Sequence, residues 1–319
     1  MAFRNAFKIL YGRFNPVWAV LLFMVVLGLV VGALSYFLIN PVYSALFEAG
    51  ILDLTDFPSL TQILTSPAQM NVLFNDILAG IEIGELGERI SMIWTDIMLI
   101  FREQSSLRVP TIILFFVLVS IFRFLLGFYE LPLYKIIEGS MSCDAKFGFF
   151  SRFIGTLLLS LKYVGIKLLY TTAYDALFYL ILYYLFTLFT ITYAWVVAPL
   201  ILVFVIVFIS LRYTTLAFFG VNTAVSNDGI LKSFRFAFQK GFKHFFYIFV
   251  RFLLVWTIII LLNIFFGLFT FFVGLLFTIP LCMYYIAIMN MTLYYSTTGK
   301  RYYADGKIIT PPTAMRVLQ

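Results

Sequence analysis

The chain has 319 residues, of which 63% are hydrophobic, 20% aromatic and only 12% charged. Soluble domains carry about a quarter charged residues, so this composition excludes an ordinary soluble enzyme, a disordered chain and a disulfide-rich secreted scaffold. The net charge of +7 would suggest a nucleic-acid partner in a soluble protein. In so apolar a chain, the charge is better explained by orientation in a bilayer, and we expect no nucleic-acid partner.

The first apolar run, Val17 to Leu38, follows a short leader with three basic residues, Arg4, Lys8 and Arg13. The run exceeds the ~7–15 apolar residues of a secretory signal peptide, and ~20 such residues can cross the hydrocarbon core. We therefore expect residues 1–38 to form a basic leader and a retained first transmembrane helix.

Residues 39–109 form the only sizeable segment that we expect outside the membrane. Ser66 and Pro67 are typical of a helix start, and apolar residues recur at helical spacing between Ile90 and Phe101. One interpretation is a set of amphipathic helices that pack on the outer membrane surface or on the bundle. The other is a segment that docks a protein partner or acts in gating, and the two are compatible.

Residues 110–294 are predicted to form a five-helix membrane bundle, followed by a polar cytoplasmic tail over residues 295–319. Polar and aromatic residues suggest a turn near 190–195, and we divide the last apolar block near 267–270. The expected crossings cover residues 110–129, 172–192, 195–216, 246–266 and 269–291. Pro280 is expected to bend the last crossing or open it locally, because proline removes a backbone donor.

The distribution of basic residues predicts the orientation. With the amino terminus inside, the inner side holds 19 basic and 6 acidic residues, a net charge of +13. The outer side holds 3 basic and 9 acidic residues, a net charge of −6. Because Lys and Arg concentrate in cytoplasmic loops, we predict an all-α polytopic protein of the bacterial inner (plasma) membrane. It would have about six spans, with both termini in the cytoplasm.

Two inner loops resemble each other when the sequence is shifted by 84 residues. Tyr163 then aligns with Tyr247, and Lys167 aligns with Arg251. Each loop begins with Ser and Asp as helix caps and continues into a basic, aromatic stretch that leads to a crossing. This plan is compatible with a parallel repeat.

Each basic stretch is expected to form an amphipathic helix on the inner leaflet, with phenylalanines in the acyl boundary and cations at lipid phosphates. The cations expected to contact anionic lipid are Arg235, Lys240, Lys243 and Arg251.

Two charged residues fall within expected spans, Arg123 in the second and Asp175 near the inner start of the third. Their depths are similar, so they could pair inside the bundle and serve a substrate or a proton. Alternatively, Arg123 extends its head group to the interface and Asp175 is an interfacial residue.

Asn263 and Pro280 in the last two spans could mark a broken-helix ligand site, or they could serve helix packing. In the first span, Gly28 and Gly32 form a GxxxG pattern suited to close helix contact, including contact with a second copy.

The sequence lacks the motifs of the common enzyme and metal sites. Cys143 and Cys282 are far apart, and His244 is the single histidine, so a disulfide framework or a zinc site is not indicated. GxSxG, HExxH, CxxC and P-loop patterns are missing. We therefore expect no catalytic residues, no cofactor and no metal, and we predict that the chain is not an enzyme.

Residues 212–312 resemble a diffuse group of bacterial integral membrane proteins that includes the YciC-like proteins. The group also includes the membrane domain attached to some glycerophosphodiester phosphodiesterases. The resemblance rests on the sequence Gly-Ile-Leu-Lys-Ser-Phe-Arg-Phe-Ala-Phe from Gly229, on two following hydrophobic helices, and on Leu293-Tyr294-Tyr295 before a polar tail. It covers about a third of the chain. No soluble phosphodiesterase domain accompanies it, so it implies no catalytic activity here.

Two functions remain open. The first is a non-enzymatic scaffold or accessory subunit in envelope, lipid or transport processes, in contact with anionic inner-leaflet lipids and with a partner through residues 39–109. The alternative is a transporter or channel with a polar path near Arg123, Asp175 and Asn263. Polar residues that converge on one water-accessible cavity would favour transport, whereas a solid apolar bundle would favour the scaffold.

Overall fold

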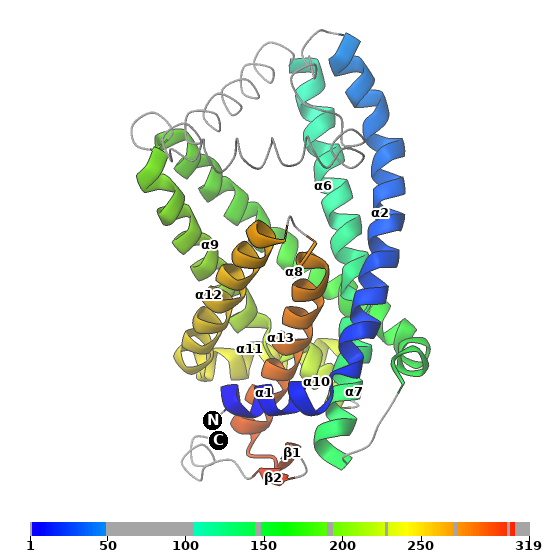
Figure 1. Ribbon diagram of the computed structural model, residues 1–319, viewed down its shortest axis with the longest axis vertical. Helices are drawn as coiled ribbons and strands as arrows, with labels where there is room; N and C mark the ends of the chain where they lie inside the picture. Colours follow the sequence, from blue (N-terminus) through cyan, green and yellow to red (C-terminus); the bar gives the residue numbers. More distant parts are fainter. Residues whose placement is uncertain are drawn as a thin grey trace. The chain divides into compact units, whose positions relative to one another are not determined.

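The computed structural model describes residues 2–48, 105–143, 148–189, 194–226, 229–270, 273–304 and 307–309. Elements carry the labels of Figure 1. The helices are α1 (Ala2–Gly12), α2 (Asn15–Glu48), α6 (Ser105–Gly127), α7 (Glu130–Cys143), α8 (Phe149–Phe189), α9 (Ala194–Leu216), α10 (Phe219–Val225), α11 (Ile230–Lys243), α12 (Phe245–Phe269) and α13 (Leu275–Thr298). Strands β1 (Tyr302–Ala304) and β2 (Lys307–Ile309) pair antiparallel, with Tyr303 opposite Ile308. Most of the expected outer segment, 39–109, lies outside the described residues.

Six stretches among the described residues are long and apolar enough to cross a membrane. They are Asn15–Leu34, Phe116–Ser142, Phe149–Leu182, Pro199–Val225, Phe245–Gly267 and Leu275–Thr298. The prediction of a mostly helical, multi-pass chain with six candidate spans is therefore confirmed. Two of these stretches each combine a long helix with the short helix that follows it, α6 with α7 and α9 with α10.

The chain divides into two compact units. The first comprises Met1–Leu29, Ile121–Ala176 and Phe204–Gln319, and it contains the buried core and the ion pairs and hydrogen-bond networks described below. The second comprises Val30–Ser120 and Leu177–Val203, in which Phe116 of α6 meets Tyr179 of α8 edge-to-face at 6.4 Å.

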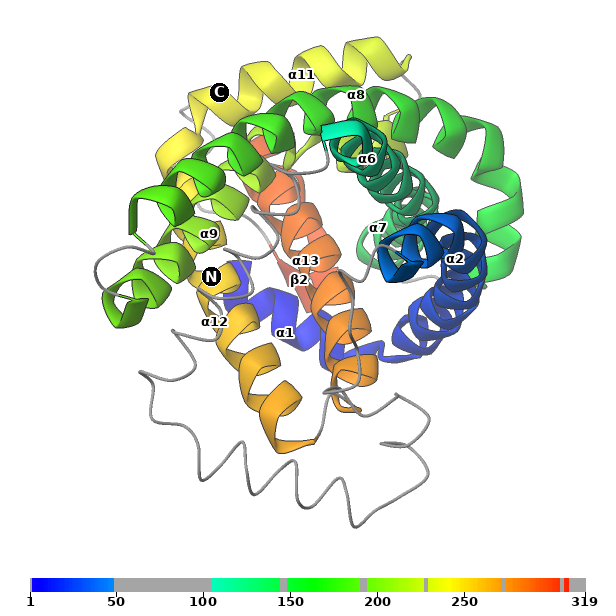
Figure 2. The same ribbon diagram turned by 90° about the horizontal axis from the view of Figure 1, so that it is seen from above.

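Within the first unit, α13 is the central helix. It packs against α1, α7, α10 and α12, and Figure 2 shows α1, α7 and α12 on different sides of it. Its residues from Tyr284 to Thr297 are all buried. Because one helix makes all of these contacts, its interfaces hold the other elements of the unit in place.

The short helices α7 and α10 are almost fully buried, unlike the long helices that precede them. They pack on each other and on α13, and Leu131 and Leu133 of α7 and Phe219 of α10 have no exposed surface. By contrast, large apolar side chains such as Leu169 of α8 remain exposed. Exposed apolar side chains suit contact with lipid, since lipid tails are as apolar as leucine.

The structure corrects the expected third span. Instead of a separate basic helix followed by a crossing over residues 172–192, α8 is one helix of 41 residues from Phe149 to Phe189. No proline interrupts this stretch, and its threonines stay within the helical pattern. Thr156 Oγ1 donates to the carbonyl of Arg152, and Thr171 Oγ1 donates to that of Lys167. In the stretch that the 84-residue shift aligns with it, two separate helices form, α11 and α12, with a break at His244.

Both ends of the chain are more structured than expected. The basic leader forms its own helix, α1, and the first transmembrane helix continues to Glu48 rather than Leu38. The expected polar tail, 295–319, begins inside α13, which continues to Thr298 with Tyr295 to Thr297 buried. The β1–β2 hairpin follows, and Tyr302 and Ala304 in it are each 3% exposed. Asn5 Nδ2 donates to Tyr302 Oη at 2.7 Å, so the hairpin is attached to α1.

Candidate functional site

The charged residues of the bundle form two groups, and the first is centred on Asp175 of α8. Asp175 forms an ion pair with Arg123 of α6, so the structure brings together the two residues that the sequence places at similar depth. Asp175 Oδ1 also lies 3.1 Å from Nη1 of Arg212 in α9. The three side chains are 13% to 27% exposed. One carboxylate thus connects three long helices.

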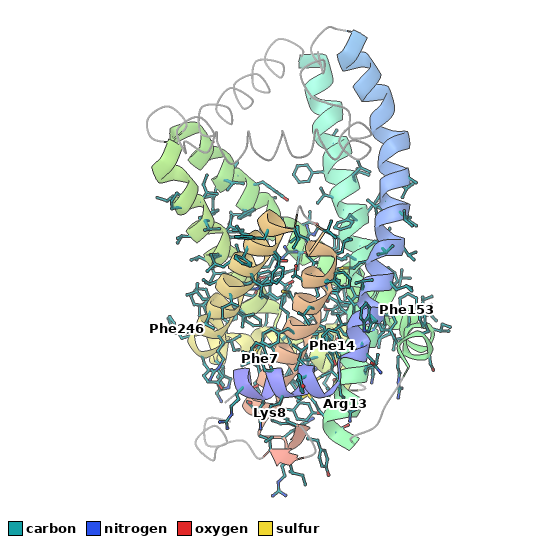
Figure 3. The ribbon with its side chains drawn as sticks, in the orientation of Figure 1. Phe7, Lys8, Arg13, Phe14, Phe153 and Phe246 are labelled. Atoms are coloured by element: carbon teal, nitrogen blue, oxygen red, sulfur yellow. The ribbon has the colours of Figure 1, made fainter. Side chains whose placement is uncertain are left out.

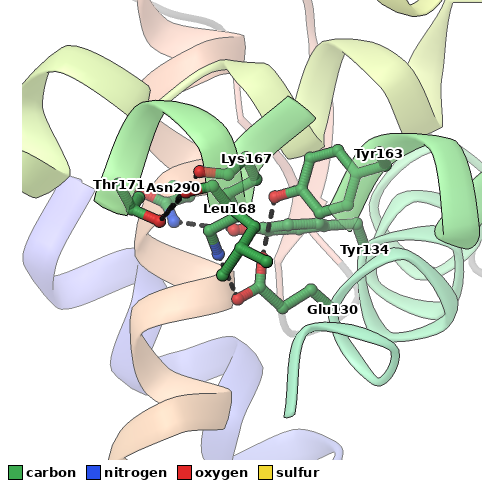
Figure 4. A network of polar contacts seen from close by, with 7 residues as sticks. All are labelled: Glu130, Tyr134, Tyr163, Lys167, Leu168, Thr171 and Asn290. Carbon is green, nitrogen blue, oxygen red and sulfur yellow. Dashed lines mark hydrogen bonds and ion pairs between the residues drawn. The ribbon is translucent and has the colours of Figure 1, made fainter. Parts of the chain in front are cut away.

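The second group is centred on Glu130, the first residue of α7 (Figure 4). Tyr163 Oη donates to Glu130 Oε2 at 2.7 Å, and Lys167 Nζ forms an ion pair with Oε1. Tyr163 and Lys167 are four residues apart in α8, and residues at this spacing face the same side of a helix. Both can therefore reach one carboxylate.

The two groups lie close enough to form one charged cluster, made of Arg123, Glu130, Lys167, Asp175 and Arg212. Lys167 is within electrostatic range of both arginines. Three cations and two carboxylates give the cluster a formal net charge of +1. A charge at the bilayer centre is unfavourable by ~2.5–3.5 kcal/mol on insertion scales, and the paired carboxylates offset that energy. The surplus charge suits an anion rather than a cation.

A close contact between α7, α8 and α10 lies beside the Glu130 group. Asn290 Nδ2 of α13 donates to Tyr134 Oη of α7 at 2.8 Å (Figure 4). A Cβ atom at Gly220 of α10 would lie 2.5 Å from Cε2 of Tyr134 and 2.7 Å from Oη of Tyr163. Position 220 therefore has no room for a larger side chain.

A second buried network joins α10, α11 and α13. Asn222 Nδ2 donates to Ser233 Oγ at 3.1 Å, and Tyr294 Oη donates to Asn222 Oδ1 at 3.0 Å. All three side chains are buried. One amide therefore uses both of its ends to connect three helices.

Asn263 belongs to a third network, apart from the charged cluster. Its Oδ1 accepts a hydrogen bond from Thr278 Oγ1 at 2.7 Å, and its Nδ2 donates to the carbonyl of Ile259 and lies 3.7 Å from Cys282 Sγ. Among the described residues, no hydrogen bond or ion pair joins Asn263 to the charged cluster. α13 continues through Pro280 without ending. The residues of the expected polar path therefore lie in two separate networks, Arg123 and Asp175 in one and Asn263 in the other.

The expected lipid-contacting cations occupy α11 and the start of α12. Arg235 and Lys243 are exposed, whereas Lys240 and Arg251 are partly buried. The Arg251 guanidinium lies 3.3 Å from the centre of the Tyr247 ring, and its Nη1 donates to the Tyr247 carbonyl at 3.2 Å. Arg251 has no carboxylate partner within the described part of the chain, and its contact with lipid phosphate stays a prediction.

His244 lies at the break between α11 and α12. Partial burial and the neighbouring charges of Lys240 and Lys243 lower the pKa of His244 below its usual value. The imidazole is therefore mostly neutral at pH 7.

Gly28 and Gly32 of α2 are exposed, and a Cβ atom at either position would meet no described atom within 4 Å. Within the described part of the chain, the GxxxG pattern therefore takes no part in packing. Contact of this pattern with a second copy of the chain stays a prediction.

Within the described ranges, no group of three or more His, Cys, Asp or Glu side chains could hold a metal ion. Cys282 is buried and not in a disulfide.

Sequence reasoning missed three members of the charged cluster, Glu130, Lys167 and Arg212. Each lies at or near the end of an apolar run, where charges are ordinarily solvated. Helical spacing gave a usable signal, because Lys167 lies two turns before Asp175 on α8, with Tyr163 a further turn away. The repeat shift of 84 residues also aligns Lys167 with Arg251.

Searches against protein-family models, curated proteins and solved structures found no match. The resemblance of residues 212–312 to the YciC-like group stays a prediction.

Proposed function

We propose that this chain is a non-enzymatic integral membrane protein that acts as a scaffold or accessory subunit in envelope, lipid or transport processes. The observation that supports this proposal is the pairing of polar side chains with one another across helices. Asp175 and Glu130 each bind cations or hydroxyls from other helices, and Asn222 and Asn263 each bind side chains of other helices. Such pairs suit a bundle that keeps one arrangement and presents surfaces to partners.

The orientation belongs to the same proposal. Both termini would lie in the cytoplasm of a bacterial cell, the basic residues of α11 and α12 would face anionic lipid, and residues 39–109 would meet a protein partner outside. The calculated net charges of +13 inside and −6 outside support this arrangement.

The test is purification of the tagged full-length chain from its native membrane in a mild detergent, with quantitative mass spectrometry of co-purifying proteins. We expect a partner in near-stoichiometric amount. Replacing Glu82, Glu85 and Glu88 together with glutamine should reduce it at least fivefold, whereas the matched change of Lys240 and Lys243 to glutamine should not. A chain that purifies without any enriched partner would contradict the proposal.

One observation favours the alternative, an anion transporter or channel. The charged cluster combines five side chains from four helices and carries a surplus positive charge. Purified chain in liposomes would then move a small anion down its gradient, and Asp175→Asn would change the rate at least tenfold. Flux no greater than in empty liposomes would remove this alternative, together with its path near Arg123 and Asp175.

A further inference from the structure

Helix α1 divides the side chains of residues 4–11 among three faces. Residues four apart lie on the same side of a helix, and each face of α1 repeats at this spacing. The second face carries the cations Arg4 and Lys8, and the third carries the aromatic rings of Phe7 and Tyr11; Figure 3 labels Phe7 and Lys8 on this helix. α1 packs against α13 and β1, and the first face is the one that is buried, with Asn5, Ala6, Ile9 and Leu10.

The aromatic face of α1 is exposed. Tyr11 is 92% exposed and Phe7 is 49% exposed, although the Phe7 ring also lies 4.9 Å from that of Tyr285. Exposed rings continue beyond the end of α1, because Phe14 and Trp18 are 44% and 53% exposed. Aromatic side chains are enriched at the membrane–water interface, so this row of rings suits the boundary between headgroups and acyl chains.

The cations of α1 have no counter-ion in the described part of the chain. Arg4 and Lys8 are exposed, and their side chains form no ion pair or hydrogen bond with the described residues. Residues 1–38 contain no Asp or Glu, so α1 and the first apolar run supply no acidic partner. Basic side chains beside a bilayer attract anionic headgroups. Lipid phosphates therefore complement this face in charge.

The path of the chain brings α1 close to the membrane. α1 ends at Gly12, and the first candidate span begins at Asn15 with the start of α2. Three residue steps of extended chain cover at most ~11 Å. Figure 1 shows α1 lying across the direction of the first turns of α2 rather than continuing it. The end of α1 therefore lies beside the point where the first candidate span begins.

The rest of the protein fixes the orientation of α1. Asn5 Nδ2 donates to Tyr302 Oη at 2.7 Å, and both side chains are 3% exposed. Ala6 and Ile9 are 0% and 5% exposed. Because the first face is held in this way, the basic and aromatic faces keep one orientation, as a binding surface requires.

We propose that α1 is a membrane-surface helix that binds anionic phospholipid in the leaflet beside the amino terminus. Phe7 and Tyr11 enter the boundary between headgroups and acyl chains, and Arg4 and Lys8 bind headgroup phosphates. A lipid fits better than an acidic protein, because the exposed rings continue from α1 into the first candidate span. This surface lies on a different helix from the lipid-contacting cations of the proposed function. It does not depend on whether the chain acts as a scaffold or as a transporter.

The test places the photoreactive amino acid p-benzoylphenylalanine at position 11 of the full-length chain, in nanodiscs of phosphatidylcholine with one quarter phosphatidylglycerol. After illumination, mass spectrometry of the intact chain identifies the attached lipid. We expect phosphatidylglycerol to be enriched about threefold over its share of the bilayer, because nearby cations favour anionic headgroups. The control carries the same group in place of Leu261, which is 53% exposed in a block without charged residues. Its adducts should match the composition of the bilayer.

Matched variants separate the basic face from general attraction to the membrane. Arg4→Gln with Lys8→Gln should return the adducts at position 11 to the composition of the bilayer, whereas the total lipid adduct should remain. Lys162→Gln with Arg235→Gln removes two exposed cations of α8 and α11 and should leave the enrichment unchanged. Equal unfolding temperatures would show that all variants fold.

Three results would overturn the proposal. One is the absence of a lipid adduct at position 11, which would place this side chain in water. Another is an adduct without enrichment of phosphatidylglycerol, or an enrichment that Arg4→Gln with Lys8→Gln does not change. The third is a cross-link from position 11 to a protein in native membranes, which would assign this face to a protein partner. These outcomes are separate from the co-purification that tests the proposed function.

Discussion

Two pairs of residues related by the 84-residue shift show how one sequence pattern serves two environments. Lys167 of α8 lies 5.8 Å from the centre of the Tyr163 ring, and Arg251 of α12 lies 3.3 Å from that of Tyr247. Lys167 has the carboxylate of Glu130 as its partner. The residue aligned with Glu130 is Thr214, whose hydroxyl donates to the carbonyl of Ser210 in its own helix.

The difference shows that the carboxylate, rather than the cation–aromatic pair, determines whether a cation joins the protein core. With Glu130 present, Lys167 becomes part of a cluster that connects four helices. Because Thr214 stands at the position aligned with Glu130, Arg251 gains no such carboxylate, and its guanidinium stays over the Tyr247 ring at the start of α12. Cation–π contacts contribute ~0.5–1 kcal/mol at exposed sites, which is too little to bury a cation alone.

The largest expected effect is that of Glu130→Gln. Removing one partner of a buried ion pair is unfavourable by ~3–5 kcal/mol, because Lys167 would lose its counter-ion. We expect the free energy of unfolding in detergent to fall by an amount in this range. Glu130→Gln combined with Lys167→Met should recover most of it. If the free energy of unfolding falls by less than ~1 kcal/mol, the Glu130 carboxylate is not what distinguishes the surroundings of Lys167 from those of Arg251.

The next prediction concerns Gly220, where α10 packs against α7 and α8. Gly220→Ala would place a methyl group against Tyr134 and Tyr163, and overpacking of this kind is unfavourable by ~1–3 kcal/mol. The control is Gly165→Ala in α8. The added Cβ atom would meet no described atom within 4 Å, so this change should be neutral or stabilising. Equal unfolding temperatures for the two variants would argue against the close contact.

A double-mutant cycle tests the ion pair between Arg123 and Asp175. We expect Asp175→Asn and Arg123→Gln to be coupled by ~1–3 kcal/mol, because residues in one ion pair do not act independently. The measurement is the unfolding free energy of both single variants and of the double variant. Additive effects would favour the alternative in which Arg123 extends to the interface.

Arg251→Gln is expected to have a smaller effect on stability, ~0.5–1 kcal/mol, because its main contact is the Tyr247 ring. Its effect on lipid contact should be clearer. In nanodiscs, added anionic lipid should stabilise the wild-type chain more than this variant. The same response in both proteins would show that Arg251 does not contact lipid phosphate.

The smallest expected effect concerns His244. Since the pKa of His244 is lowered in the folded chain, its neutral form is favoured there. The contribution of neutral His244 to the free energy of unfolding is fully present above the pKa that histidine has in the unfolded chain, ~6.5. This contribution decreases as the pH falls below that value. Because His244 is the single histidine, its titration can be followed by NMR of ¹³C-labelled chain. Lys240→Gln should raise the pH at the midpoint of this titration. A midpoint at or above ~6.5 in the wild-type chain would contradict this prediction.

The sequence was sufficient to predict the six candidate spans, because a long apolar run has few alternatives to a membrane helix. It also brought Arg123 and Asp175 to similar depths. It did not reveal α7 and α10, because each continues a span and ordinary apolar residues form both. Their burial depends on contacts with α13, which lies far away in the sequence.

The other differences between the sequence-based predictions and the structure also arise from contacts that the sequence does not reveal. Whether a helix continues through a basic stretch depends on local packing, so α8 is one helix whereas α11 and α12 are two, although both stretches are basic and aromatic. Glu130 and Lys167 are 37 residues apart, and in the sequence each one is indistinguishable from an ordinary interfacial charge. Only their arrangement in space makes them a pair.

The hydrogen bond between Asn5 and Tyr302 has a consequence for the path of the chain through a membrane. Two residues whose side chains touch in this way lie on the same side of the bilayer. The chain between them must then cross an even number of times, whichever side that is. A single reporter attached near either end would therefore locate both ends at once.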